Sequence, residues 1–160
     1  MAHPRDHQER VEAWLAHAGG GASSPALVAL LQGALDALWR RAQQTLGDVT
    51  VRAIVSRALV TASSRHPLQR ALMVDAEGVS CAALAHVVGA ARPAPAAIGP
   101  ADPAAVRAAV HDVLVEVLTV LGDLTANILT GALHDALMTV TAPEPGAGAS
   151  RGAGASAEPD

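Results

Sequence analysis

Phenylalanine, tyrosine and lysine do not occur in this sequence, and Trp14 and Trp39 are its only aromatic residues. Because 51% of the 160 residues are nevertheless apolar, any hydrophobic core must be built from Leu, Val and Ala. Ala and Leu are among the strongest helix formers, so this composition favours helices that approach each other closely. The shortage of aromatic rings also removes the stacking platforms with which proteins bind single-stranded nucleic acid.

Signals for membrane insertion or export are missing as well. The most apolar stretch, residues 113–121, contains Glu116 and is far shorter than the roughly 20 residues that a bilayer-spanning helix needs. Residues 1–18 carry charged side chains throughout, unlike the apolar centre of a secretory signal. The only cysteine, Cys81, cannot form a disulfide within the chain, which fits a reducing compartment. A net charge of −4 gives no overall attraction to nucleic acid or anionic lipid, so we expect a cytoplasmic protein without a membrane partner.

Catalytic and cofactor motifs are equally scarce. The sequence has no G-x-S-x-G, P-loop, G-x-G-x-x-G or H-E-x-x-H pattern. Cys81 and His86 are five residues apart, a spacing that places them on different helical faces, and we interpret Cys81 as a small buried side chain. The sequence therefore predicts no enzyme and no cofactor.

Seven histidines raise the question of a metal site. His3 and His7 have i, i+4 spacing but lie close to the terminus, and His111 and His134 lie in different segments. Helical carboxylate–metal bundles use Glu-x-x-His motifs, and the sequence contains none. We predict scattered surface histidines and no metal.

The strongest pattern is an internal duplication. Leu-Gly-Asp-Val-Thr at 46–50 matches Leu-Gly-Asp-Leu-Thr at 121–125, and about twenty residues before each match a capping residue precedes a proline, as Ser24-Pro25 and Asp102-Pro103. We therefore predict an all-α fold, a pseudo-duplicated bundle of two helix–LGD–helix units. The predicted structural turns are Gly47, Asp48, Gly122 and Asp123. Whether LGD forms a tight corner or a kink in a long helix stays open.

The domain boundaries follow from these units. Residues 1–24 are predicted to form a short amphipathic helix and a Gly-rich linker, ahead of a single helical domain at 25–141. That domain consists of repeat unit 25–64, connector 65–101 and repeat unit 102–141. In the connector, Val79 and Leu84 suit a hydrophobic staple around an N-cap at Ser80, which predicts a short helix ending near Gly89. Residues 142–160 are Ala, Gly, Ser, Pro and Glu almost throughout, which predicts a disordered tail.

Charge distinguishes the two units. Residues 36–74 hold six arginines and two carboxylates, whereas residues 102–138 hold five carboxylates and one arginine. The simpler interpretation is two solvated faces, and the sharper one is complementary docking, within one chain or between the subunits of a homodimer. The candidate interaction residues are Arg40, Arg41, Arg52, Arg57, Asp112 and Glu116.

These observations favour a non-catalytic helical interaction or regulatory module of bacterial type that binds protein, most simply another copy of itself. A small-molecule sensor that holds an apolar ligand inside the bundle is the first alternative, and a DNA-binding regulator that uses the Arg-rich first unit is the second. A large exposed aliphatic patch would support association, and a sizeable enclosed cavity would support the sensor. Convergence of the four arginines on one convex face would support DNA binding.

Overall fold

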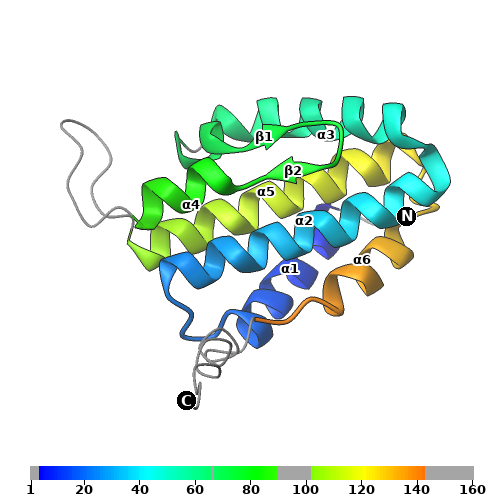
Figure 1. Ribbon diagram of the computed structural model, residues 1–160. Coiled ribbons are helices and arrows are strands. Elements are labelled where there is room, and N and C mark those ends of the chain that lie inside the picture. Colours follow the sequence, from blue (N-terminus) through cyan, green and yellow to red (C-terminus); the bar gives the residue numbers. More distant parts are fainter. Residues whose placement is uncertain (1–3, 66, 90–101, 143–160) are drawn as a thin grey trace, which may run out of the picture.

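The computed structural model describes residues 4–65, 67–89 and 102–142, and these residues form six α-helices and one small hairpin (Figure 1). The elements are α1 (Pro4–Ala18), α2 (Ser24–Leu46), α3 (Asp48–Ser63), the 3-10 helix η1 (Pro67–Ala71), β1 (Met73–Val74), β2 (Val79–Ser80), α4 (Ala82–Gly89), α5 (Pro103–Leu124) and α6 (Thr130–Met138). The predicted all-α fold is confirmed. No helix in these ranges combines the length and the apolarity needed to cross a bilayer.

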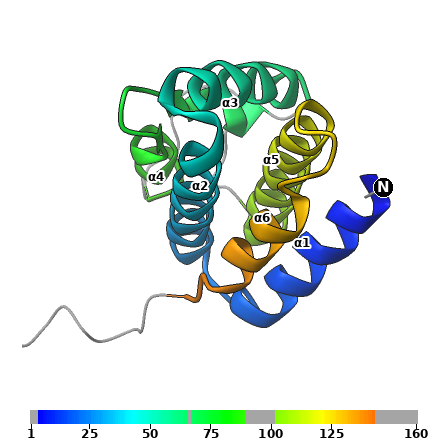
Figure 2. The ribbon, with the colours of Figure 1, turned by 90° about the vertical axis from the view of Figure 1, so that its right-hand side faces the viewer.

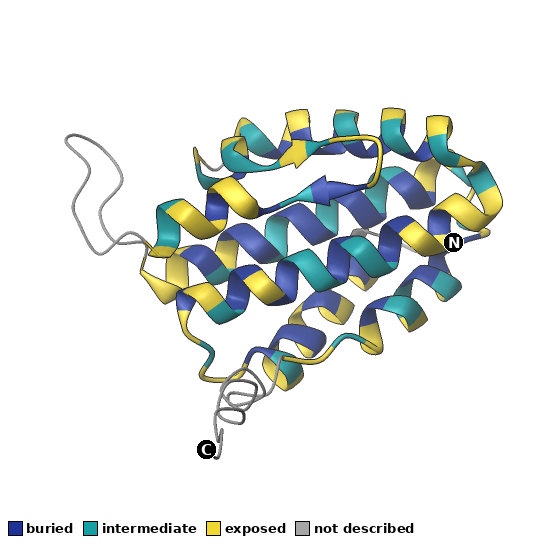
Figure 3. Ribbon diagram, in the orientation of Figure 1, coloured by how far each residue is buried: buried dark blue, intermediate teal, exposed yellow. Residues whose placement is uncertain are grey.

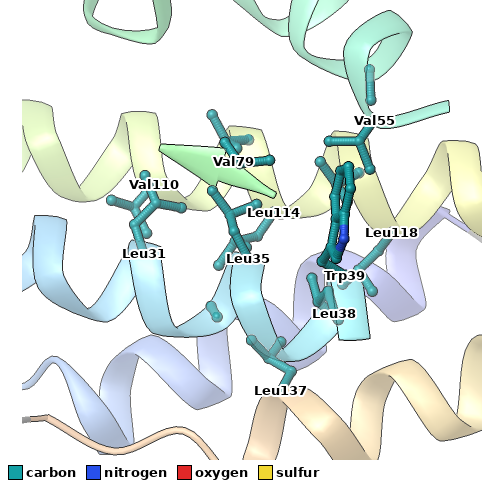
Figure 4. Close-up of a cluster of buried hydrophobic side chains, with 14 of the residues drawn as sticks. Leu31, Leu35, Leu38, Trp39, Val55, Val79, Val110, Leu114, Leu118 and Leu137 are labelled. Atoms are coloured by element: carbon teal, nitrogen blue, oxygen red, sulfur yellow. The ribbon is translucent and has the colours of Figure 1, made fainter. Parts of the chain in front are cut away.

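Helix α5 lies at the centre of the bundle and packs against α1, α2, α3 and α6. Its apolar residues recur at helical spacing, so nearly every turn contributes a side chain to the core (Figure 3). Leu114 and Leu118 point into a cluster that also holds Trp39 of α2 (Figure 4). As the composition requires, the core is aliphatic, with Trp14 and Trp39 as its only large rings.

Helix α1 belongs to this same core, which differs from the expected domain start at residue 25. Val11, Trp14 and Leu15 are at most 2% exposed, and the indole Nε1 of Trp14 donates a hydrogen bond to the carbonyl of Val140 at 2.9 Å. The glycines after α1 form a defined turn, in which Arg107 of α5 donates to the carbonyl of Gly19 at 3.0 Å. The apolar face of α1 is part of the common core because α5 and α6 pack against it.

The first LGD sequence is a tight corner. Helix α2 ends at Leu46 and α3 begins at Asp48, so Gly47 alone connects them. Gly47 has φ +79°, a conformation in which a Cβ would be strained, and its N–H donates to the carbonyl of Gln43 at 3.0 Å. In the first unit, the Leu-Gly-Asp sequence is therefore a corner between two helices and not a kink within one long helix.

The second LGD sequence behaves differently, and the prediction that Gly122 and Asp123 form a turn is wrong. Both residues lie in the last turn of α5. Gly122 is buried, and a Cβ there would lie 3.2 Å from Asn127 Oδ1 and 3.4 Å from His7 Nε2. Glycine is therefore suited to this position by its small size rather than by its backbone freedom. The chain turns later, over residues 125–129, where Ala126 and Asn127 have φ of +49° and +64°.

The second helix of each expected unit packs against the first helix of the other unit. Helix α3 packs on α5, and α6 packs on α2. Two copies related by an approximate twofold axis would show this crossed pairing. The second helices differ in length, however, with 16 residues in α3 and 9 in α6, and the duplication stays a prediction.

The connector folds against α2. Strands β1 and β2 pair antiparallel, and the side chain of Gln32 in α2 donates to the carbonyl of Val79 at 2.7 Å and accepts from the N–H of Cys81 at 2.8 Å. Helix α4 ends at Gly89, as expected, and Val79 and Leu84 are both buried. The predicted N-cap at Ser80 is wrong, because Ser80 belongs to β2 and the carbonyl of Cys81 accepts the first hydrogen bond of α4, from the N–H of Ala85 at 2.8 Å. Residues 90–101, where we expected an irregular connection, lie outside the described residues, as does the predicted disordered tail from residue 143 onward.

Candidate functional site

The predicted basic residues do not form one cluster of free charges. Arg40 and Arg41 are exposed near the end of α2, where Arg41 donates to the side chain of Gln44 at 3.0 Å. Arg52 on α3 is half-buried and contacts Asp48 at 3.2 Å and the carbonyl of Ala76 at 3.4 Å. Arg57, further along α3, is exposed. One guanidinium nitrogen of Arg52 makes both of these contacts within the chain, whereas Arg40, Arg41 and Arg57 are exposed to solvent.

The predicted acidic residues lie on α5 and are half-buried. Asp112 contacts the ring of His111 at 3.1 Å, and Glu116 contacts Arg65 at 3.2 Å. The second contact joins the basic segment after α3 to the acidic helix α5, so complementary docking within one chain occurs for this pair. Arg65 is 57% exposed, and such a pair stabilises a fold only weakly. Neither carboxylate pairs with any of the four predicted arginines in the described part of the chain.

Three large aliphatic side chains are exposed at one end of the bundle, and we call them the apolar end: Val49 (81% exposed), Leu124 (60%) and Ile128 (82%). Val49 lies in the first turn of α3, Leu124 is the last residue of α5, and Ile128 lies in the α5–α6 turn. The α2–α3 corner and the α5–α6 turn both lie at the end of the molecule that faces the viewer in Figure 2. Sequence periodicity did not single out this group.

The α5–α6 turn is held in an uncommon backbone conformation. Ala126 and Asn127 are both left-handed, a region that Asn tolerates but Ala rarely adopts. The turn is closed by hydrogen bonds from Asn127 N–H to the Gly122 carbonyl at 2.7 Å and from Ile128 N–H to the Thr125 carbonyl at 3.0 Å. Backbone strain of this kind concentrates at functional positions. Here the hydrogen bonds that close the turn hold Ala126 and Asn127 in the strained conformation.

A histidine pair lies at the interface between α1 and α6. The Nδ1 atom of His7 and the Nε2 atom of His134 are 2.9 Å apart, and the rings meet edge to face with centroids 5.1 Å apart. His7 is only 2% exposed, so the prediction of scattered surface histidines is wrong for this residue. One signal in the sequence could have found it, because His7, Val11 and Trp14 are spaced i, i+4 and i+7 on one helical stripe.

The surroundings of the pair disfavour its protonation. Burial lowers the pKa of His7, against the opposing attraction of Asp6 and Asp123. Burial also lowers the pKa of His134, and the neighbouring His7 and Arg10 lower it further. Beside the pair, Asp6, Arg10 and His134 contribute to the lining of an open groove of about 540 Å³ between α1 and α6.

The remaining chemistry of the described residues is sparse. They contain no group of three or more His, Cys, Asp or Glu side chains placed to hold a metal ion. Cys81 is buried, and burial together with Asp36 raises the pKa of its thiol to about 12, which keeps it out of nucleophilic chemistry near neutral pH. The apolar cavity beneath η1 and α4, to which Gln69 contributes its side chain, measures about 10 Å³, room for a single water molecule.

Comparisons of this chain with protein-family models, with curated proteins and with solved structures found no match. Its function is therefore inferred from its own residues. Two features of the described structure are unusual enough to carry an inference. One is the apolar end on its constrained turn, and the other is the histidine pair between α1 and α6.

Proposed function

We propose that this protein is a non-catalytic helical interaction module that forms a homodimer through the apolar end. The observation that carries the proposal is that the α2–α3 corner and the α5–α6 turn lie at the same end of the bundle (Figure 2), and that Val49, Leu124 and Ile128, which belong to these segments, are 60–82% exposed. Full burial of a side chain of this size contributes about 1.5–3 kcal/mol, so three of them on each subunit supply a substantial driving force for association. Grouped exposed apolar side chains mark interaction sites far more often than scattered ones do.

Charge favours a second copy of this chain as the partner. A twofold axis that runs across the line from the α2–α3 corner to the α5–α6 turn would place the corner of one subunit against the turn of the other. Val49 would then face Leu124 and Ile128. The exposed Arg41 lies before the corner and the exposed Asp123 lies before the turn, so opposite charges would meet around the apolar contact.

The constrained turn supports the same interface. A rigid turn loses little conformational freedom on binding, so more of the contact energy appears as affinity. Backbone hydrogen bonds from Asn127 to Gly122 and from Ile128 to Thr125 close the segment between Leu124 and Ile128 within the single chain. The turn thus resembles a pre-organised contact more than a mobile loop.

The structure offers less support for the two alternatives, a sensor of an apolar ligand and a DNA-binding regulator. A sensor for an apolar ligand needs a chamber of about 300 Å³ or more, and the apolar cavity beneath η1 and α4 measures only about 10 Å³. A DNA-binding face needs free arginines, and Arg52 is already engaged with Asp48 and Ala76. We propose a cytoplasmic location for the dimer, because the single thiol of Cys81 fits a reducing compartment.

The proposal is tested by sedimentation equilibrium over a range of protein concentrations. We expect the wild-type chain to reach dimer mass, and Ile128→Glu to remain monomeric because a carboxylate would have to be buried. Val60→Glu is the matched control, since Val60 is 72% exposed on α3 but does not belong to the apolar end. Monomer mass for the wild type at all concentrations, or equal loss of the dimer in the control, would refute the proposal.

The charge component has its own test. Raising the salt concentration should weaken the wild-type dimer, because exposed charges are screened. The single changes Arg41→Asp and Asp123→Arg should each weaken it, and the double change should restore it. If the double variant is weaker than either single variant, the assignment of Arg41 opposite Asp123 is wrong.

A further inference from the structure

We propose that His7 and His134 form an acid-sensitive latch that fastens the N-terminal half of α1 to α6 and opens when both rings are protonated. The residues are 127 positions apart in the sequence, and their facing ring nitrogens are 2.9 Å apart. His7 is almost completely buried and His134 is half-buried. The latch does not depend on the proposed dimer, because both of its residues lie in the same chain.

The proton count of the pair determines whether the contact holds. A hydrogen bond between two imidazoles needs an N–H on one facing nitrogen and a lone pair on the other. One added proton can go to the outer nitrogen of the donating ring, which leaves that hydrogen bond in place. A second added proton must go to the accepting nitrogen. Two N–H groups would then point at each other across 2.9 Å, between two positively charged rings.

Charged groups on all three neighbouring helices act on the pair. Asp6 and Arg10 come from α1, Asp123 comes from the end of α5, and Asp135 comes from α6. The three carboxylates favour the protonated rings and Arg10 disfavours them. Burial outweighs the carboxylates at both rings, so the pKa of each stays below 6.5.

Acid therefore acts against the docked state. Once α1 separates from α6, both rings enter water and regain an ordinary pKa near 6.5. Between pH 6.5 and the lower pKa values of the docked rings, the separated state binds more protons than the docked state does. Docking is thus fully stable above about pH 7 and weakens as the pH falls through that interval.

Opening the latch should affect only part of α1. The C-terminal half of α1 is also held by Trp14 and Leu15 in the core, so it stays docked while the segment around His7 is released. Release would widen the groove between α1 and α6. It would also remove the His7 ring from its place against Gly122, at the base of the turn that carries the apolar end.

The test uses the full chain and two measurements. The first is a ¹⁵N NMR titration of the histidine rings in the wild-type protein. We expect the pair to take up its two protons in two coupled steps below pH 6.5, with an N–H···N tautomer pattern at pH 8. Independent titration of His7 and His134 at the ordinary pKa would overturn the proposal, and this readout needs no substitution.

The second measurement is amide hydrogen exchange along α1, expressed as protection factors. In the wild type, protection around His7 should fall as the pH drops from 7.5 to 5, by up to about tenfold per pH unit for each proton bound. Circular dichroism first establishes that His134→Gln is folded. In this variant protection should be lower at pH 7.5 and should fall less steeply with acid than in the wild type, because only His7 remains to bind a proton at this contact. His17→Gln, an exposed position on the same helix, should behave like the wild type. Unchanged wild-type protection, or an equal effect of His17→Gln, would overturn the latch.

Discussion

Two valines on the same helix provide a direct test of the core. Val55 is 3% exposed and points into the cluster that holds Trp39 and Leu118 (Figure 4), whereas Val60, five residues later on α3, is 72% exposed. The change to alanine removes two methyl groups at each position. At Val55 the lost transfer energy is about 0.8 kcal/mol per group, and the cavity left behind adds to it.

The comparison between the two variants isolates burial from helix propensity. Alanine forms helix better than valine by about half a kcal/mol, and this gain is common to both positions, so it cancels in their difference. We expect Val55→Ala to be less stable than Val60→Ala by about 2 kcal/mol. For a chain of this size that corresponds to a Tm difference of roughly 4–8 °C. Val60→Ala should match the wild type or slightly exceed it.

Urea unfolding followed by circular dichroism measures this difference, at a protein concentration low enough to avoid association. The urea dependence of the unfolding free energy should be the same for both variants, because both expose the same surface on unfolding. A difference below about 0.5 kcal/mol would mean that α3 does not present Val55 to the core. A larger loss at Val60 would mean that the helix is rotated.

Three further predictions concern single positions. Leu118→Ala, at the fully buried centre of α5, should lower the unfolding free energy by about 2–5 kcal/mol in the same urea assay, and a near-neutral result would contradict the central place of α5. Gly47→Ala should destabilise by about 1–2 kcal/mol because φ is +79° there, whereas Gly131→Ala, in the open on α6, should stabilise by up to about 1 kcal/mol; equal effects would contradict the corner. Cys81 should resist thiol reagents at pH 8 until the protein is unfolded, because burial raises its pKa to about 12, and rapid labelling of the folded protein would show that the thiol is accessible.

The long helices could be predicted from the sequence because their stripes are local. Apolar residues at helical spacing follow a capping residue and a proline, and α2 and α5 begin within a residue of the expected starts. Leu38 of α2 and Leu118 of α5, which lie on these stripes, are buried. The aliphatic core could also be predicted, because the sequence contains only two aromatic residues.

The second LGD sequence shows where local reasoning fails. Glycine serves either a left-handed corner, as at Gly47, or a close approach, as at Gly122, and the same three letters fit both. Which role applies depends on what packs against the residue. At Gly122 the neighbours are His7 and Asn127, and only the docked α1 brings His7 there.

The candidate sites could not be predicted from the sequence either, because they too depend on which helices pack together. The charged residues chosen from the sequence lie mostly apart, and the one contact between the basic and acidic segments uses Arg65 instead. His7 and His134 each lie on an inward stripe of their own helix, but nothing local indicates that the two helices meet. The apolar end likewise combines Val49 of α3 with Leu124 and Ile128, which lie more than seventy positions later in the sequence.

The central position of α5 has a consequence for the order of events during synthesis. Helices α1, α2 and α3 all rest on a helix that the ribosome makes after them. Until residue 124 has been synthesised, the apolar faces of α1, α2 and α3 that pack on α5 stay exposed to water. These three helices therefore cannot complete their packing before α5 has been made. A product that stops before residue 102 should therefore aggregate or bind chaperones rather than fold in part, because exposed apolar surface on incomplete chains drives both outcomes.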